Sequence, residues 1–362
     1  MSVDFLENPI IIEDMEQLYQ QKIEWGRLKN KKVMITGAYG MLATYLVYML
    51  IYLNETYQYN IQIWVVVRNL QKLEEKFGVY VKKDYFNSYF HELDSEIRLE
   101  EKMEYIIHAA SLASPQYYEK IPVEVIKPNV IGTYYLLEYA KKCHTKNFLF
   151  FSSSEIYGKQ AEEVKVNYDE NTLGIINPME IRNCYSEGKR MGENLCACYS
   201  LEYGINTNSI RIFHTYGPTM DIKNDKRAFS EFVLNVLENK DIEMRSTGMA
   251  KRPFCYISDA VAAFFLVLLT DKSATVYNMC AEENYISIKE LAEILVGLYP
   301  EKNLCVRRTV LEEDSLYSKK KDENQITADS SKLKKMGWCP QIKVKEGFRR
   351  TIEGIKWGMD AH

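Results

Sequence analysis

The feature that most constrains the fold is a buried strand that runs into a glycine turn and then into an apolar helix. Residues 31–36 predict the strand, and residues 44–53 predict the helix. Between them Gly37, Gly40 and Ala43 follow the spacing G-x-x-G-x-x-A. Glycines in such a turn let the backbone approach a pyrophosphate, which then lies at the positive end of the helix. The stretch therefore predicts a dinucleotide-binding, doubly wound α/β fold with a parallel sheet.

Charge, hydropathy and cysteine content exclude several classes of protein. The 46 basic and 50 acidic residues nearly cancel, so we expect neither a nucleic-acid partner nor a membrane-surface partner. The longest apolar run, residues 260–269, is about half the length that a bilayer requires and predicts a buried helix. The eight cysteines form no C-x-x-C pair, and the first residues do not read as a signal peptide. We expect a cytoplasmic protein without a metal site.

The second strand, residues 61–67, ends in Arg68 and Asn69, where a carboxylate normally holds the ribose of NAD. An arginine at this place pairs with the 2′-phosphate of NADP or simply faces solvent. The sequence therefore leaves NAD and NADP both open. Asp94 and Ser95 are expected beside the adenine, and the small residues that follow the strand near residue 105 suit close passage of the cofactor.

Tyr185 and Lys189 are four residues apart in a stretch without proline, so a helix places both side chains on one face. A phenol has a pKa of about 10, and a nearby ammonium is expected to lower it by roughly three units. The phenolate would then take a proton from a sugar hydroxyl while a hydride leaves the same carbon. The pair is common by chance, and it gains weight from Ser152, Ser153, Ser154 and Glu155 some thirty residues earlier.

Four runs of the sequence resemble a known family. They are residues 110–118 (Ala-Ser-Leu-Ala-Ser-Pro-Gln-Tyr-Tyr), 150–158 (Phe-Phe-Ser-Ser-Ser-Glu-Ile-Tyr-Gly), 177–190 and 211–218. The chain resembles the UDP-glucuronate decarboxylases (UDP-xylose synthases) of the extended short-chain dehydrogenase/reductase family, the NAD-dependent epimerases and dehydratases, from Val33 to about Trp357. The resemblance implies a tightly bound NAD or NADP, a nucleotide-sugar substrate and a homodimer.

The same resemblance implies two domains behind an N-terminal extension. We expect an amphipathic helix in residues 1–30, packed on the main domain, and a solvated loop in residues 312–322. Residues 256–259 are expected to cap the apolar helix that follows. The domains are predicted as 31–212 with about 256–277 for the dinucleotide, and 213–255 with 278–362 for a smaller α/β domain that binds the nucleotide sugar.

The motifs and the resemblance together give the expected site residues. The expected catalytic residues are Tyr185, Lys189, Ser153, Ser154 and Glu155. The expected substrate contacts are Tyr118, Arg182, His214, Arg227 and Arg252. The expected cofactor contacts are Gly37, Tyr39, Gly40, Met41, Arg68, Asn69, Asp94, Ser95, Ala109, Ala110, Ser111, Asn129 and Ser152, together with Tyr185 and Lys189.

Ser154 favours one reaction of the family over another. A 4,6-dehydratase carries an aspartic acid directly before the glutamate, because the hydroxide that it expels must be protonated as it leaves. Carbon dioxide needs no such acid, so Ser154 before Glu155 favours decarboxylation. A 4,6-dehydratase, a 4-epimerase, an NADPH-dependent 4-keto-sugar reductase and a non-catalytic dinucleotide sensor stay open as alternatives. His214 and Thr219 depart from the asparagine and arginine that the family usually has at these positions.

Overall fold

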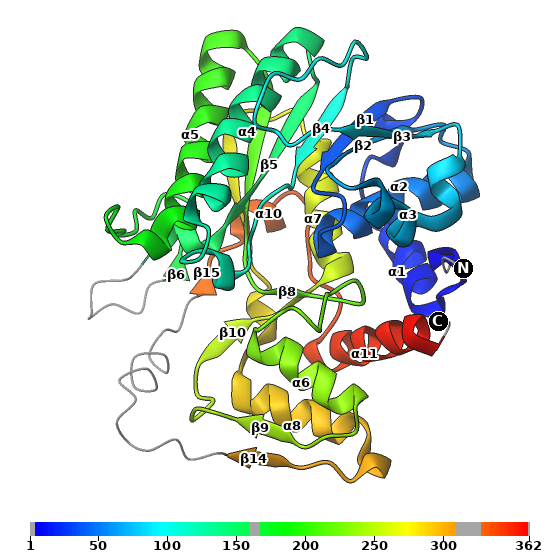
Figure 1. Cartoon of the computed structure of the whole chain (residues 1–362), viewed down its shortest axis with the longest axis vertical. Helices are drawn as coiled ribbons and strands as arrows, with labels where there is room; N and C mark the ends of the chain where they lie inside the picture. Colours follow the sequence, from blue (N-terminus) through cyan, green and yellow to red (C-terminus); the bar gives the residue numbers. More distant parts are fainter. Residues whose placement is uncertain (1–3, 159–166, 309–326, 361–362) are drawn as a thin grey trace.

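The computed structural model describes residues 4–158, 167–308 and 327–360 (Figure 1). Its centre is a parallel sheet with the strand order β12-β7-β5-β4-β1-β2-β3, which confirms the doubly wound α/β fold. The predicted loop at residues 312–322 lies outside the described residues. The strands are β1 Lys32–Thr36, β2 Gln62–Val67, β3 Phe86–Phe90, β4 Tyr105–His108, β5 Asn147–Ser153, β7 Thr207–Ile212 and β12 Thr275–Met279.

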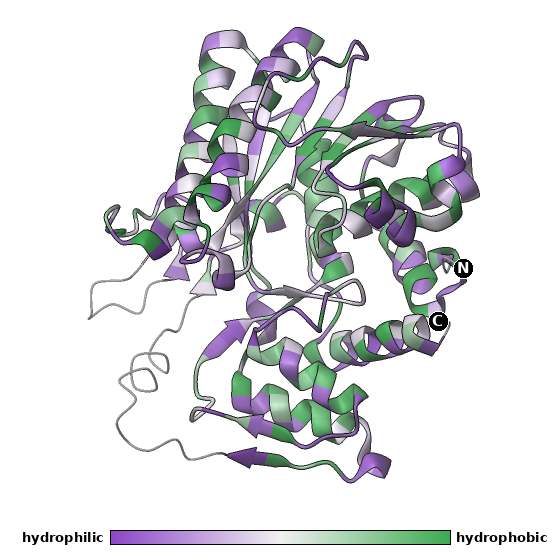
Figure 2. Cartoon of the chain, in the orientation of Figure 1, coloured by the Kyte–Doolittle hydropathy of each residue, from purple (hydrophilic) through white to green (hydrophobic). Residues whose placement is uncertain are grey.

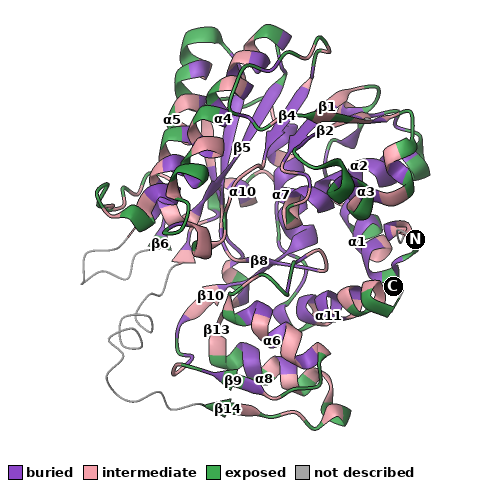
Figure 3. Ribbon diagram, in the orientation of Figure 1, coloured by how far each residue is buried: buried purple, intermediate pink, exposed green. Residues whose placement is uncertain are grey.

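Helices cover both faces of this sheet, which explains why β1, β2 and β4 are nearly continuous apolar runs without polar alternation. Helices α4 and α5 lie on one face, and α2 and α7 pack together on the other (Figure 1). Hydrophobic and buried residues coincide in the central strands and in α7, whereas the outer faces of α4 and α5 are exposed (Figures 2 and 3). The bounds are α2 Met41–Tyr57, α3 Leu70–Phe77, α4 Pro122–Cys143, α5 Cys184–Tyr203 and α7 Ile257–Leu268.

The smaller elements gather beyond the carboxyl ends of the strands (Figure 1). Four two-stranded pairs, β8 with β11, β10 with β13, β9 with β14 and β6 with β15, stand among the short helices. The predicted domain boundaries stay a prediction. The bounds are β6 Asn167–Tyr168, β8 Thr215–Tyr216, α6 Ala228–Leu237, β9 Ile242–Met244, β10 Lys251–Pro253, β11 Cys255–Tyr256, β13 Tyr285–Ser287, α8 Ile288–Leu298, β14 Val306–Arg308, β15 Thr327–Ala328, α10 Ser331–Lys334 and α11 Val344–Asp360.

Within the described ranges, no helix has the length and apolar character needed to cross a membrane. The apolar run at 260–269 is the buried helix α7, as expected. The predicted cap of this helix is wrong in detail: Tyr256 is the cap residue and its side chain makes no capping hydrogen bond. Asp259 instead accepts hydrogen bonds from the backbone N–H groups of Gln341 at 2.9 Å and Ile342 at 3.0 Å. The carboxylate therefore holds the segment that leads into α11.

Helix α1, Pro9–Tyr19, is amphipathic and buries Ile11, Met15 and Leu18. Asn8 caps it by accepting from the N–H of Ile10 at 3.1 Å. The helix contacts α2, α7 and α11, so it joins the helices on one face of the parallel sheet to the last helix of the chain.

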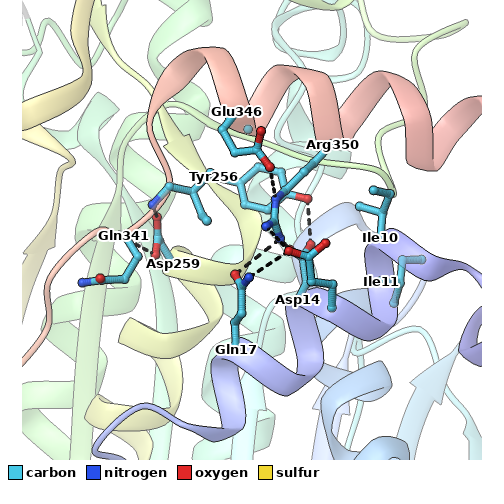
Figure 4. Close-up of polar contacts among 12 residues, drawn as sticks. Ile10, Ile11, Asp14, Gln17, Tyr256, Asp259, Gln341, Glu346 and Arg350 are labelled. Carbon is cyan, nitrogen blue, oxygen red and sulfur yellow. Dashed lines mark hydrogen bonds and ion pairs between the residues drawn. The ribbon is translucent and has the colours of Figure 1, made fainter.

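A buried carboxylate forms the centre of this junction (Figure 4). Asp14 is fully buried and accepts hydrogen bonds from Arg350 of α11 at 2.6 Å, from Tyr256 of β11 at 2.7 Å and from Tyr45 of α2. Burial raises the pKa of Asp14 to about 6, while the tyrosine hydroxyls and the charge of Arg350 act in the opposite direction. Four elements that are distant in sequence therefore share one carboxylate.

Candidate active site

The glycine turn brings the end of β1 against the end of β4. Gly37 has a φ of +70°, and a Cβ on it would lie 2.7 Å from the Cα of Ala110. Only glycine fits this contact and this conformation. Gly40 is the N-cap of α2 and offers no side-chain cap, so the first N–H groups of the helix have no partner from within it. The turn is therefore built to receive an anion at the helix N-terminus.

Buried polar atoms around this turn fit a dinucleotide. The Ser111 hydroxyl and the Asn129 Oδ1 atom are both buried and have no hydrogen-bond partner among the described residues. The Asn129 amide donates to the carbonyl of Val125 at 2.7 Å, which leaves its oxygen for a ligand. Since buried polar groups are normally satisfied, these atoms and the open helix terminus fit the ribose hydroxyls and phosphates of NAD.

The residues predicted beside the adenosine lie on the surface. The Tyr39 hydroxyl bonds the backbone of Asn69, with the Asn69 N–H donating to it at 3.0 Å, and so joins the glycine turn to the end of β2. Arg68, Asp94 and Ser95 are exposed. The Ser95 hydroxyl donates a hydrogen bond to the Asp94 carboxylate at 3.2 Å, so these two side chains are in contact.

A buried histidine that sequence reasoning did not single out braces the same edge. The Thr36 hydroxyl accepts a hydrogen bond from the N–H of Ala110 at 3.0 Å and lies 2.8 Å from His108 Nδ1. His108 Nε2 lies 2.9 Å from the carbonyl of Pro128 in α4. Burial lowers the pKa of His108 to about 3, so the ring is neutral and its Nε2 carries the proton that Pro128 accepts.

Tyr185 and Ser153 meet as predicted. Tyr185 lies in the first turn of α5, and the Ser153 side chain at the end of β5 lies close enough to lower the pKa of the Tyr185 hydroxyl. Tyr118 stacks on the Tyr185 ring at 4.9 Å between ring centroids, with planes 10° apart. The Tyr118 hydroxyl donates to the carbonyl of Ala113 at 2.9 Å, which fixes the ring from the other side. The anchored Tyr118 ring therefore limits the motion of the Tyr185 ring.

Lys189 lies one turn after Tyr185, with Nζ 5.6 Å from the Tyr185 ring centroid and 2.6 Å from the carbonyl of Phe151, to which it donates. Burial lowers the pKa of Lys189 to about 7. The expectation that Lys189 lowers the pKa of the phenol is wrong for the protein alone. Burial instead raises the pKa of Tyr185 to about 12, although the nearby Ser153 side chain lowers it.

Glu155 lies beside Tyr185 in the 3-10 turn Ser154–Tyr157. Its carboxylate is 3.5 Å from Arg182 Nη1, and the Arg182 guanidinium lies 6.0 Å from the ring centroid of Tyr118. The charge of Glu155 raises the pKa of Tyr185 and of Tyr118. The predicted residues Ser153, Glu155, Tyr118 and Arg182 therefore surround Tyr185, with Ser154 in the adjoining turn.

Two arginines and a histidine form a second group nearby. Burial, together with the charges of Arg252 and Arg227, lowers the pKa of His214 to about 3 and keeps it neutral. Burial also lowers the pKa of Arg252, while the charge of Glu155 raises it, which connects this group to the first. Arg227 bonds Asp225 at 2.6–3.0 Å and lies over the ring of Phe229. The charges of Arg227 and Arg252 therefore both act on the buried His214.

One predicted cofactor contact has another partner. The hydroxyl of Ser152 donates to Glu193 in α5, and Glu193 pairs with Arg211 of β7. Sequence reasoning missed Glu193 and Arg211. The sequence does contain a signal for Glu193: it follows Lys189 by four residues, as Lys189 follows Tyr185, so a helix places all three side chains on one face. Arg211 carries no local signal, since its partner is in a different element.

Comparison with known proteins follows this geometry. A sequence model of the NAD dependent epimerase/dehydratase family matches residues 33–280. UDP-glucuronic acid decarboxylase 3 of Arabidopsis thaliana is 30% identical over 328 residues, which cover 90% of this chain and 90% of that protein. UDP-glucuronic acid decarboxylase 1 of Xenopus tropicalis is 27% identical over 94% of this chain and 77% of its own length.

Solved structures show the same fold. UDP-glucuronic acid 4-epimerase from Bacillus cereus, in complex with UDP-glucuronic acid and NAD, aligns with a TM-score of 0.73 at 21% identity, over 90% of this chain and 99% of that one. dTDP-glucose 4,6-dehydratase from Bacillus anthracis, in complex with NAD, gives 0.72 at 19% identity, over 91% and 98%. The family match over most of the chain carries the assignment. The chain belongs to the NAD dependent epimerase/dehydratase family and is an NAD-dependent enzyme that modifies nucleotide sugars.

Proposed function

We propose that the enzyme decarboxylates UDP-glucuronate through a transient 4-keto sugar and releases UDP-xylose. The observation that carries the proposal is Ser154, a residue that cannot act as a strong acid, directly before Glu155 and beside Tyr185. The two relatives named above carry this activity in their names, which supports the same reading.

Each side chain has a role in this reaction. In its phenolate form, Tyr185 takes the proton of the carbon-4 hydroxyl, and the nearby Ser153 side chain, which lowers the pKa of this phenol, orients the same oxygen. Bound NAD supplies the transient oxidation of carbon 4 by taking up a hydride and later returning it. Arg252, whose charge interacts with Glu155, neutralises a substrate carboxylate or diphosphate. Glu155, held by Arg182, positions a water that returns a proton to carbon 5.

Since the ketone at carbon 4 accepts the electrons of the breaking carbon–carbon bond, the carboxylate leaves as carbon dioxide without an acid. Expulsion of hydroxide from carbon 6 would need a proton donor at the place of Ser154. The arrangement around Tyr185 therefore favours decarboxylation over dehydration.

The test uses the holoenzyme in deuterated water with UDP-glucuronate and no added reductant. We expect release of carbon dioxide and a UDP-pentose that carries one solvent deuteron at carbon 5, measured by mass spectrometry and NMR. Intact UDP-glucuronate, together with a 4-keto-6-deoxy product from a nucleotide-linked glucose, would assign the enzyme as a dehydratase. The same products in ordinary water serve as the control.

Arg68 favours a second candidate, reduction of a 4-keto sugar with NADPH. If its exposed guanidinium grips a 2′-phosphate, Arg68→Ala weakens NADP binding by about ten-fold or more and leaves NAD binding unchanged. Arg98→Ala is the matched control, because Arg98 is also exposed and pairs only loosely with Glu96 at 3.6 Å. Cofactor titration by fluorescence measures both. Equal affinities of wild type and Arg68→Ala for NADP would show that Arg68 faces solvent.

We further propose that the chain works as a cytoplasmic homodimer. Apolar side chains are exposed on the outer faces of the two adjacent helices: Val123, Ile131 and Tyr134 on α4, and Met191, Leu201 and Tyr203 on α5. A second copy of the same surface would bury them. All eight cysteines are free, as a reducing compartment would keep them. A monomer in sedimentation velocity at micromolar concentration would contradict the dimer.

A further inference from the structure

Glu193 is a nearly buried carboxylate on α5, one turn after Lys189. Arg211 grips both of its oxygens, through Nε at 3.0 Å and Nη2 at 2.8 Å, and the two side chains are 11% and 9% exposed. The hydroxyl of Ser152 donates to the same carboxylate. Two guanidinium hydrogen bonds and one from a hydroxyl are the surroundings of a fixed anion. The reaction steps above leave this anion without a role.

Strand register explains how the anion is held. Ser152 of β5 lies directly opposite Arg211 of β7, so the two side chains point to the same face of the sheet. Helix α5 packs over these two strands, and its Glu193 carboxylate meets the side chains of both. Arg211 uses its remaining nitrogen on the hydroxyl of Tyr157 at 2.8 Å and on the carbonyl of Glu170 at 2.9 Å. The carboxylate is therefore locked from two neighbouring strands.

The same helix holds the catalytic turn on both sides of Ser153. Lys189 donates to the carbonyl of Phe151, two residues before Ser153. Arg190 donates to the carbonyl of Ile156, three residues after it, at 2.7 and 2.9 Å. A rotation or slide of α5 relative to β5 would move the whole turn. Glu193 joins helix and strand at the centre of this arrangement.

Charge gives Glu193 a second effect. Burial lowers the pKa of Lys189 to about 7, and the negative charge of Glu193 opposes this change. The other groups around Lys189 are the neutral His108 of β4, the Tyr185 ring on the same helix and Arg211, which is already bound to Glu193. Without the carboxylate, the Lys189 ammonium would be buried with no opposing charge from Glu193.

Building on the function proposed above, we propose that Glu193, locked by Arg211, is a positioning residue that keeps Lys189 charged and holds the Ser152–Glu155 turn in register with Tyr185.

The first test measures Lys189 directly and needs no turnover. The holoenzyme is labelled with ¹³C at the lysine Cε atoms, its NMR signals are followed against pH, and Lys189→Met identifies the Lys189 signal. In Glu193→Gln we expect Lys189 to lose its proton about one pH unit lower, or more, than in wild type. Glu202→Gln is the matched control, because it removes an exposed carboxylate from the same helix and leaves the titration unchanged. An unshifted Lys189 in Glu193→Gln overturns the proposal.

The second test is the pH profile of turnover. The alkaline limb of kcat should move to lower pH in Glu193→Gln by the same amount, whereas a merely structural role would lower kcat equally at every pH. Glu193→Asp keeps the charge and should restore the position of the limb. Arg211→Lys keeps both charges but loses the two-pronged bond, so it should lower kcat without moving the limb.

A variant that fails to fold and an enzyme without activity on nucleotide sugars can each be distinguished from a failure of this proposal. If Glu193→Gln does not fold, the double variant Glu193→Gln/Arg211→Met removes both members of the ion pair, so the Arg211 guanidinium is not left buried without its anion, and the Lys189 titration is measured in this variant instead. If no nucleotide sugar is turned over, the proposed function fails while the Lys189 titration still decides the role of Glu193.

Discussion

Tyr185→Phe is expected to lower kcat by about a hundred- to ten-thousand-fold, the range that a positioned acid or base contributes. The change deletes one oxygen, the phenol oxygen that we propose as the base and that lies near Ser153. The ring that stacks on Tyr118 at 4.9 Å is kept, so NAD affinity and thermal stability should stay close to wild type. Single-turnover kinetics with UDP-glucuronate measure the loss, and cofactor titration checks the site.

Tyr199→Phe provides the matched control. It makes the same chemical change on the same helix, about 21 Å further along the axis, where the hydroxyl donates to Glu138 at 2.6 Å. We expect full turnover from this variant. If Tyr185→Phe keeps more than about a tenth of the wild-type rate, its barrier has risen by less than about 1.4 kcal/mol, and Tyr185 is not the base.

Arg350→Met is expected to lower the free energy of unfolding by about 3–5 kcal/mol at pH 8, because it leaves the Asp14 carboxylate buried without its cation. The pKa of Asp14 in the folded chain, about 6, lies above its ordinary value of 3.8. A raised carboxyl pKa means that the stability this group contributes is full at low pH and is lost as pH rises through 6. The loss in Arg350→Met should therefore be smaller at pH 5. Urea denaturation at both pH values measures it.

The neighbouring Arg349 offers a control on the same helix. Arg349 pairs with Glu346 and Glu353, but its side chain is 34% exposed, and exposed pairs contribute about 0–1 kcal/mol. Arg349→Met should therefore change stability by less than about 1 kcal/mol at either pH. Equal losses for the two variants would show that Asp14 does not depend on Arg350.

Local patterns predicted the fold and much of the site. The strand, glycine turn and helix around Gly37 depend on neighbours in sequence, and the structure reproduces them. Tyr185 and Lys189 were predicted from their helical spacing, and Lys189 Nζ lies 5.6 Å from the Tyr185 ring centroid. Ser153 was predicted from the resemblance to the family, and its side chain lies near the Tyr185 hydroxyl. The residue roles themselves stay predictions until variants are measured.

Pairings between distant elements could not be predicted. Asp259 looked like a helix cap because it stands early in α7, yet its carboxylate binds backbone N–H groups 82 and 83 residues later. The pKa of Tyr185 was misjudged because a charge four residues away is visible in sequence, whereas the burial that opposes it depends on the whole fold. Arg211 finds Glu193 only because β7 lies beside β5.

The junction at Asp14 has a consequence for synthesis of the chain. Its cationic partner lies 336 residues later, so at about 5–20 residues per second roughly 20 to 70 seconds separate the two during translation. Through that interval helix α1 has no cation to accompany its carboxylate into the interior, and desolvating the charge alone is costly. We therefore expect α1 to dock last. The ribosome makes it among the first elements, but the helix packs into place only after α11 has emerged with Arg350.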